Sequence, residues 1–235
     1  MTDDTLQGDR ISTGVSTLDS FLGGGFVPGG VYLLTGDVGT GKTLLAHQTA
    51  FQSTLSGGTA VYVTVYTETH TRLFAHLRPF TFFNMDTVGE QLQYFNAYHI
   101  WRQGGYSGLQ ELIQPVLIRQ RATLLIVDGL PLHHPNQDPA AMDDFLHHLQ
   151  AYSEMVQCTA LILTPPLRVD PSPLGVLLVD GVLTLTKEAR AGVVERWISV
   201  TKWRGSIYEG SPLPFTISSD GLVVSGPENA DPLSY

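Results

Sequence analysis

The chain has 235 residues, of which 43% are hydrophobic and 15% are charged, and its formal net charge at pH 7 is −9. The length and composition predict one globular domain, which we place at 10–225 between a flexible arm at 1–9 and a loose, polar tail at 226–235, and they exclude collagen-like, fibrous and small disulfide-rich classes. The negative charge argues against a nucleic acid or an anionic membrane as a partner. The sequence contains neither a membrane-spanning apolar run nor the apolar core of a signal peptide, and its single cysteine is Cys158, so we expect a cytoplasmic protein.

Apolar periodicity predicts strands and helices that alternate along most of the chain. The expected strands cover 31–35, 60–66, 93–98, 123–127 and 159–164. The expected helices cover 42–55, 71–79, 108–121 and 139–157. Three strand segments follow at 182–186, 196–201 and 214–224, the last with a turn at 219–221. This order predicts an α/β fold, with a mostly parallel twisted sheet flanked by helices and a C-terminal extension of antiparallel strands.

Residues 36–43 read GDVGTGKT, which fits the pattern G-x-x-x-x-G-K-[ST] between an expected strand and an expected helix. Phosphate oxygens must approach main-chain N–H groups closely, so such a loop needs glycines, which have no Cβ atom. The following helix points its N-terminus at the same phosphates. We therefore predict that the phosphate chain of a nucleotide is bound by Asp37, Val38, Gly39, Thr40, Gly41, Lys42, Thr43 and Leu44.

Two residues of this loop have the chemistry that phosphoryl transfer requires. Lys42 supplies a positive charge to the β and γ oxygens, and the hydroxyl of Thr43 can ligate Mg²⁺. The alternative is a glycine-rich turn that binds nothing. Against it, Lys42 is one of only three lysines in the chain and occupies the position that phosphate chemistry needs.

Two carboxylates complete the expected magnesium and water site. Asp128 directly follows the apolar run 123–127, where a carboxylate could hold Mg²⁺ through a water molecule; the alternative is an aspartate that caps a turn. Glu68 follows the expected strand at 60–66, and a parallel strand beside the loop strand would place it at the edge where ligands bind. We predict that Glu68 activates the attacking water, and the alternative is an exposed carboxylate at a helix start.

Further segments, in order along the chain, add to a family pattern. Residues 12–26 read STGVSTLDSFLGGGF, 61–64 read VYVT, 179–182 read VDGV, 202–206 read KWRGS and 214–217 read PFTI. Together with the phosphate loop and the Asp128 strand, these segments resemble the KaiC-type branch of the RecA-like P-loop ATPases. This branch includes the cyanobacterial clock ATPase, RadA-like recombinases and gas-vesicle regulators of the GvpD kind. The resemblance covers most of the chain.

The resemblance implies a single RecA-like core that binds and hydrolyses Mg²⁺-ATP between the subunits of a homo-oligomeric ring, commonly a hexamer. It also implies that Lys202 and Arg204 reach the γ-phosphate of the ATP held by the neighbouring subunit, as catalytic cations. The alternative for both residues is a solvated strand end. A regulatory output through an unidentified partner protein is part of the same expectation.

The chain departs from the family pattern at two positions. A single glutamate, Glu68, follows the second strand where the family often has two, and Gly129 stands where a serine often follows the aspartate. We therefore expect slow hydrolysis, and the alternative is an ATP-binding switch whose oligomeric state carries the signal. A DNA-binding recombinase-like factor is disfavoured, because the segments 129–139 and 165–179 contain Arg168 as their only cation.

Overall fold

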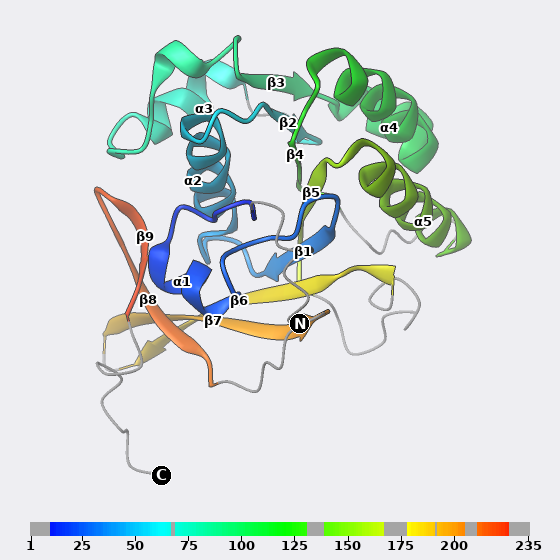
Figure 1. Cartoon of the computed structure of the whole chain (residues 1–235). Helices are drawn as coiled ribbons and strands as arrows, with labels where there is room; N and C mark the ends of the chain where they lie inside the picture. Colours follow the sequence, from blue (N-terminus) through cyan, green and yellow to red (C-terminus); the bar gives the residue numbers. More distant parts are fainter. Residues whose placement is uncertain are drawn as a thin grey trace, which may run out of the picture.

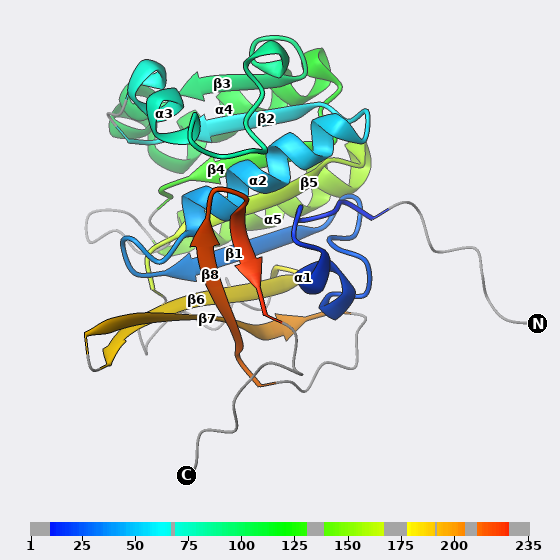
Figure 2. The same cartoon turned by 90° about the vertical axis from the view of Figure 1, so that its left-hand side faces the viewer.

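The fold is a nine-stranded sheet with helices on both faces, seen from two sides in Figures 1 and 2. The computed structural model describes residues 10–66, 69–130, 139–166, 178–190, 192–204 and 211–225. The strands are β1 (Val31–Gly36), β2 (Ala60–Thr64), β3 (Leu92–Asn96), β4 (Leu124–Asp128), β5 (Thr159–Thr164), β6 (Gly181–Arg190), β7 (Val193–Trp203), β8 (Leu213–Ser218) and β9 (Gly221–Val224).

The strand order is β3-β2-β4-β5-β1-β6-β7-β8-β9. The first six of these strands run parallel, and β7, β8 and β9 add antiparallel pairs at one side. The phosphate-loop strand β1 therefore lies inside the parallel part of the sheet, covered by strands on both sides. The predicted α/β fold with an antiparallel extension is confirmed.

Helices cover the two faces of the sheet separately. They are α1 (Ser16–Phe21), α2 (Lys42–Leu55), α3 (His70–Leu77), α4 (Tyr98–Gln120) and α5 (Pro139–Val156), with a short 3₁₀ helix at Met85–Thr87. Helix α2 packs on one face and helices α4 and α5 on the other, as Figure 1 shows. In the part of the chain that the structure describes, no helix is both long and apolar enough to cross a membrane.

Alternation along the central strands builds the two cores. In β1, Tyr32 and Leu34 face the core beneath α2, whereas Val31 and Leu33 face the core beneath α4 and α5. Because both faces of the sheet are covered, every residue of β1, β2, β4 and β5 is buried. Burial on both faces explains why these strands appear in the sequence as continuous apolar runs rather than as alternating patterns.

The observed elements differ from the predicted ones mainly at their ends. Helix α4 begins ten residues before the predicted start at 108, and its first part meets the rest at a kink at Gly105. Strands β6 and β7 form a longer hairpin than expected, and β2 ends at Thr64, two residues before the predicted end. The predicted strand at 214–224 is the β8–β9 hairpin, with its turn where expected.

Candidate functional site

The candidate site lies where parallel strands β1, β4 and β2 end. Leu34 of β1 pairs with Leu163 of β5, Leu163 pairs with Asp128 of β4, and Asp128 pairs with Thr64 of β2. The carboxyl ends of these strands therefore meet at one edge of the sheet, the edge at which open α/β folds bind ligands. The segment that follows β1 leads directly into α2, as the predicted phosphate loop requires.

The phosphate loop has a backbone that only glycine tolerates at its first position. Gly36 has φ +149, and a Cβ atom there would lie 2.2 Å from the carbonyl oxygen of Leu185. Asp37, Val38 and Gly39 are exposed, whereas Thr40 is buried and its hydroxyl donates a hydrogen bond to the Asp37 carbonyl at 2.9 Å. The middle of the loop thus faces solvent, while its two ends continue into β1 and α2.

The first turn of α2 completes the loop. Gly41 is the N-cap residue of α2 and has a left-handed backbone. No side chain among the described residues caps the helix, so the backbone N–H groups of its first turn are left to bind a ligand at the loop. Lys42 and Thr43 are the first two residues of the helix, and Leu44 follows, half-buried. The helix N-terminus and the loop amides are arranged as an anion-binding cradle.

Two lysines lie on this loop. The Lys42 ammonium donates to the carbonyl oxygens of Gly36 and Asp37. Burial lowers the pKa of Lys42, and the nearby Lys187 adds to this effect, whereas Asp128 and Asp37 oppose it. Lys187, from β6, donates to the Val38 carbonyl at 2.8 Å. The loop is therefore bounded by positive charge from its own helix and from the neighbouring strand.

Asp128 lies within reach of the loop, as predicted from the sequence. Its Oδ2 accepts a hydrogen bond from the Thr43 hydroxyl at 3.0 Å and another from the Tyr62 hydroxyl at 2.6 Å. In the described residues no group of three or more histidine, cysteine or acidic side chains is placed to hold a metal ion. The pair of Thr43 and Asp128 nevertheless fits Mg²⁺, which takes few protein ligands and fills its octahedron with phosphate oxygens and water.

A fully buried histidine supports Thr43 from within α2. His47 Nδ1 lies 2.7 Å from the Thr43 carbonyl oxygen, one helical turn away, and therefore donates to it. The imidazole stacks on the Tyr62 ring, with the ring centroids 4.2 Å apart. Burial lowers the pKa of His47 from 6.5 to about 4, so the ring is neutral at pH 7.

This histidine predicts a specific loss of stability in acid. Because the pKa of His47 is about 4 in the folded chain and 6.5 when unfolded, the unfolded state binds the proton more readily. The contribution of neutral His47 to the free energy of unfolding is fully present above pH 6.5, and it falls by about 3 kcal/mol as the pH drops toward 4. Denaturant unfolding from pH 7 to pH 4 should show a shallower loss of free energy for His47→Gln than for wild type. The exposed His147→Gln control should follow wild type, and an unchanged pH profile for His47→Gln would contradict this assignment.

Glu68 lies outside the described residues, so its predicted role stays a prediction. Three residues separate it from the end of β2 at Thr64. Tyr66, the last described residue of this segment, lies over Gly129, where an added Cβ atom would be 2.2 Å from the Tyr66 ring. Burial and the nearby Asp128 charge raise the pKa of Tyr66. Among the described residues after β2, Tyr66 thus places its phenol near Asp128.

Lys202 and Arg204 lie toward the end of the parallel strands that is opposite the phosphate loop of their own chain. Lys202 pairs with Val182 near the start of β6, whereas Gly36 lies beside Leu185. Arg204 contacts Asp180, which directly precedes β6. Five residues along the strand, or about 16 Å, separate Asp180 from Leu185, the residue beside Gly36. Neither residue is brought to its own phosphate loop.

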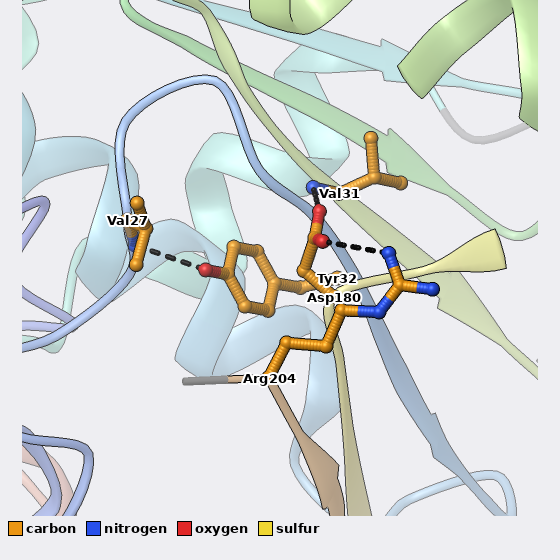
Figure 3. A network of polar contacts seen from close by, with 5 residues as sticks. All are labelled: Val27, Val31, Tyr32, Asp180 and Arg204. Carbon is orange, nitrogen blue, oxygen red and sulfur yellow. Dashed lines mark hydrogen bonds and ion pairs between the residues drawn. The ribbon is translucent and has the colours of Figure 1, made fainter. Parts of the chain in front are cut away.

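Asp180 holds Arg204 in place, as Figure 3 shows. Asp180 Oδ1 lies 3.4 Å from the Arg204 guanidinium, and Asp180 Oδ2 accepts the Val31 N–H at 2.9 Å. The Arg204 backbone N–H also donates to the Asp180 carbonyl at 2.7 Å. Half of the Arg204 side chain remains exposed, so the guanidinium is both anchored and accessible from outside the chain.

Comparison with known proteins identifies the family. The profile of the KaiC ATPase family matches residues 11–229. The chain belongs to this family. The predicted resemblance to KaiC-type P-loop ATPases of the RecA superfamily is therefore confirmed.

Individual relatives of the KaiC family are distant. The circadian clock oscillator protein KaiC of a Picosynechococcus species is 25% identical over 223 residues, which cover 92% of this chain but 42% of the clock protein. A UPF0273 protein of Thermotoga maritima is 23% identical over 239 residues, covering 94% of this chain and 98% of that protein. The crystal structure of a KaiC-like protein from Pyrococcus horikoshii has a TM-score of 0.76 at 22% identity, covering 92% and 98% of the two chains, and supports the fold.

Three residues that the sequence analysis did not select lie at the site. Lys187 contacts the loop, Tyr62 contacts Asp128, and His47 contacts Thr43. Lys187 could have been considered because lysine is so rare in this chain. Tyr62 and His47 look like ordinary core residues in the sequence, and only the fold brings them to the site.

Proposed function

We propose that this KaiC-family chain binds Mg²⁺-ATP at the 36–43 loop and hydrolyses it slowly, at sites completed between the subunits of a homo-oligomeric ring. The observation that carries the proposal is the hydrogen bond of 3.0 Å between the Thr43 hydroxyl and the Asp128 carboxylate. It brings the two predicted magnesium-binding groups together, at the mouth of a glycine loop and a helix N-terminus.

Each loop residue has a definite part in the proposed chemistry. The amides of 37–43 bind the phosphate oxygens, and Lys42 exchanges the carbonyl oxygens of Gly36 and Asp37 for those of phosphate. Thr43 ligates Mg²⁺ directly and Asp128 does so through a water molecule, while Glu68 orients and deprotonates the attacking water. When bound, Mg²⁺ neutralises charge on the β and γ oxygens.

The positions of Lys202 and Arg204 support sites shared between subunits. Both residues lie at the far edge of the sheet from their own loop, while Arg204 is anchored by Asp180 and half exposed. In a ring built by head-to-tail contacts, one edge of each subunit meets a different edge of the next. The two cations would then stabilise the charge that develops on the transferred phosphoryl group of the neighbour's ATP.

A second candidate is an ATP-binding switch with little turnover, whose oligomeric state carries a signal to a regulatory partner. The single glutamate after the second strand favours it, because the family often carries two glutamates there and a chain with one has fewer groups to activate water. Both candidates share the phosphate loop and differ in the fate of bound ATP.

Counting bound nucleotide and released phosphate separates these candidates. We expect purified protein incubated with labelled ATP to release phosphate with Mg²⁺ and not with EDTA. Stoichiometric ATP retained without phosphate release would favour the switch. Absence of ATP binding with Mg²⁺ would overturn both candidates.

A further inference from the structure

Tyr62 ends in a hydrogen bond to the carboxylate that the proposed function assigns to magnesium. Its hydroxyl donates to Asp128 Oδ2 at 2.6 Å, and the Thr43 hydroxyl donates to the same oxygen at 3.0 Å. Tyr62 is 1% exposed and Asp128 is 7% exposed. A short hydrogen bond to a buried carboxylate is among the stronger neutral-donor contacts in a protein.

The register of the sheet explains how the phenol reaches this oxygen. Tyr62 of β2 pairs with Ile126 of β4, and Asp128 lies two residues further along β4 on the same face. A diagonal neighbour at this spacing is within reach of an aromatic side chain. The contact therefore depends on β2 and β4 being adjacent and in this register.

The Tyr62 ring is held between other aromatic rings. The His47 ring stacks on it at 4.2 Å between centroids, and the Tyr94 ring lies at 5.2 Å. His47 Nδ1 also donates to the Thr43 carbonyl at 2.7 Å, so the same histidine contacts both residues that donate to Asp128. The ring cannot swing away without disturbing this packing, and the hydroxyl is fixed relative to the first turn of α2.

We infer that Tyr62 is a positioning residue for the magnesium half of the site, an inference that rests on the proposed function. The Thr43 hydroxyl can offer an oxygen lone pair to the ion while its proton still bonds Asp128 Oδ2, so the contact observed here is compatible with bound Mg²⁺. The second donor to that oxygen, the Tyr62 hydroxyl, holds the buried carboxylate in one orientation. Tyr62 thereby fixes Asp128 for the magnesium site without touching nucleotide.

The test compares Tyr62→Phe with Tyr94→Phe. Both variants remove one phenolic oxygen from the same buried cluster, but the Tyr94 hydroxyl has no hydrogen-bond partner among the described residues. Equilibrium binding of a fluorescent ATP analogue is titrated with Mg²⁺ and repeated in EDTA, and thermal unfolding of each variant is recorded. Neither readout depends on turnover.

We expect Tyr62→Phe to raise the Mg²⁺ concentration for half-maximal binding by about tenfold, as the loss of one hydrogen bond to a carboxylate implies. Its nucleotide affinity in EDTA should match wild type, and Tyr94→Phe should match wild type in both conditions. An unchanged Mg²⁺ titration for Tyr62→Phe, or equal weakening with Mg²⁺ and in EDTA, would overturn the positioning role while leaving the proposed function standing. Binding by wild type that does not respond to Mg²⁺ would instead overturn the proposed metal site itself.

Discussion

Replacing Lys42 with alanine should weaken the binding of Mg²⁺-ATP by more than about 100-fold, a loss of about 3 kcal/mol. Lys42 is the ammonium at the first position of α2, and its partners in the structure are loop carbonyls that phosphate oxygens would replace. Removing it deletes a charge-assisted contact to the β and γ oxygens while the glycine backbone remains. Isothermal titration with ATP measures the loss.

The matched control is Arg119→Ala, which also removes one cation, in this case an exposed one. Arg119 lies in the last turn of α4, toward the amino ends of the strands and away from the loop. It should bind ATP like wild type. Because Lys42 also holds the loop in its present shape, thermal unfolding of both variants should be compared. Unchanged ATP affinity in folded Lys42→Ala would remove the basis for assigning 36–43 as the phosphate site.

Mixing two inactive variants should restore activity if Lys202 and Arg204 act on the neighbour's ATP. Arg204→Ala lacks the cation offered to the next subunit, and Asp128→Asn lacks the magnesium carboxylate of its own site. Each alone should lose activity by about 10³-fold or more. In an equimolar mixed ring, about a quarter of the interfaces combine an intact Asp128 with an intact Arg204, so about a quarter of wild-type turnover should return.

The double variant Asp128→Asn/Arg204→Ala provides the control for this mixing. Combined with Arg204→Ala, it supplies no subunit that carries Arg204, so no interface can be complete and activity should stay absent. Subunit exchange between differently tagged variants is verified by co-purification. Exchange without recovery at any ratio would show that Arg204 serves no neighbouring site, and its contact with Asp180 would then be structural.

The phosphate loop and the Asp128 strand could be predicted from sequence because local geometry demands their residue types. Only glycine fits at position 36, where a Cβ atom would clash with the Leu185 carbonyl. Lys42 is the first residue of the helix that follows, where its ammonium can reach phosphate. Asp128 is visible because the fully buried strand β4 has four consecutive apolar residues directly before it. These signals lie within a few residues of one another in the chain.

The supporting contacts could not be predicted because they join residues far apart in sequence. Nothing in the segment VYVT indicates that Tyr62 meets a carboxylate 66 residues later, since that contact requires β2 to pair with β4. The anchor of Arg204 on Asp180 likewise depends on the β6–β7 hairpin. The first part of α4, before Gly105, was missed because two adjacent glycines at 104 and 105 favour a loop.

Specific ATPase activity as a function of protein concentration tests the central claim, that active sites are completed between subunits. Phosphate release from saturating Mg²⁺-ATP should be measured over about a hundredfold range of protein concentration, with sedimentation recorded in parallel. Activity per chain should rise with concentration and level off as the oligomer forms. Activity per chain that stays constant while the protein remains monomeric would contradict shared sites.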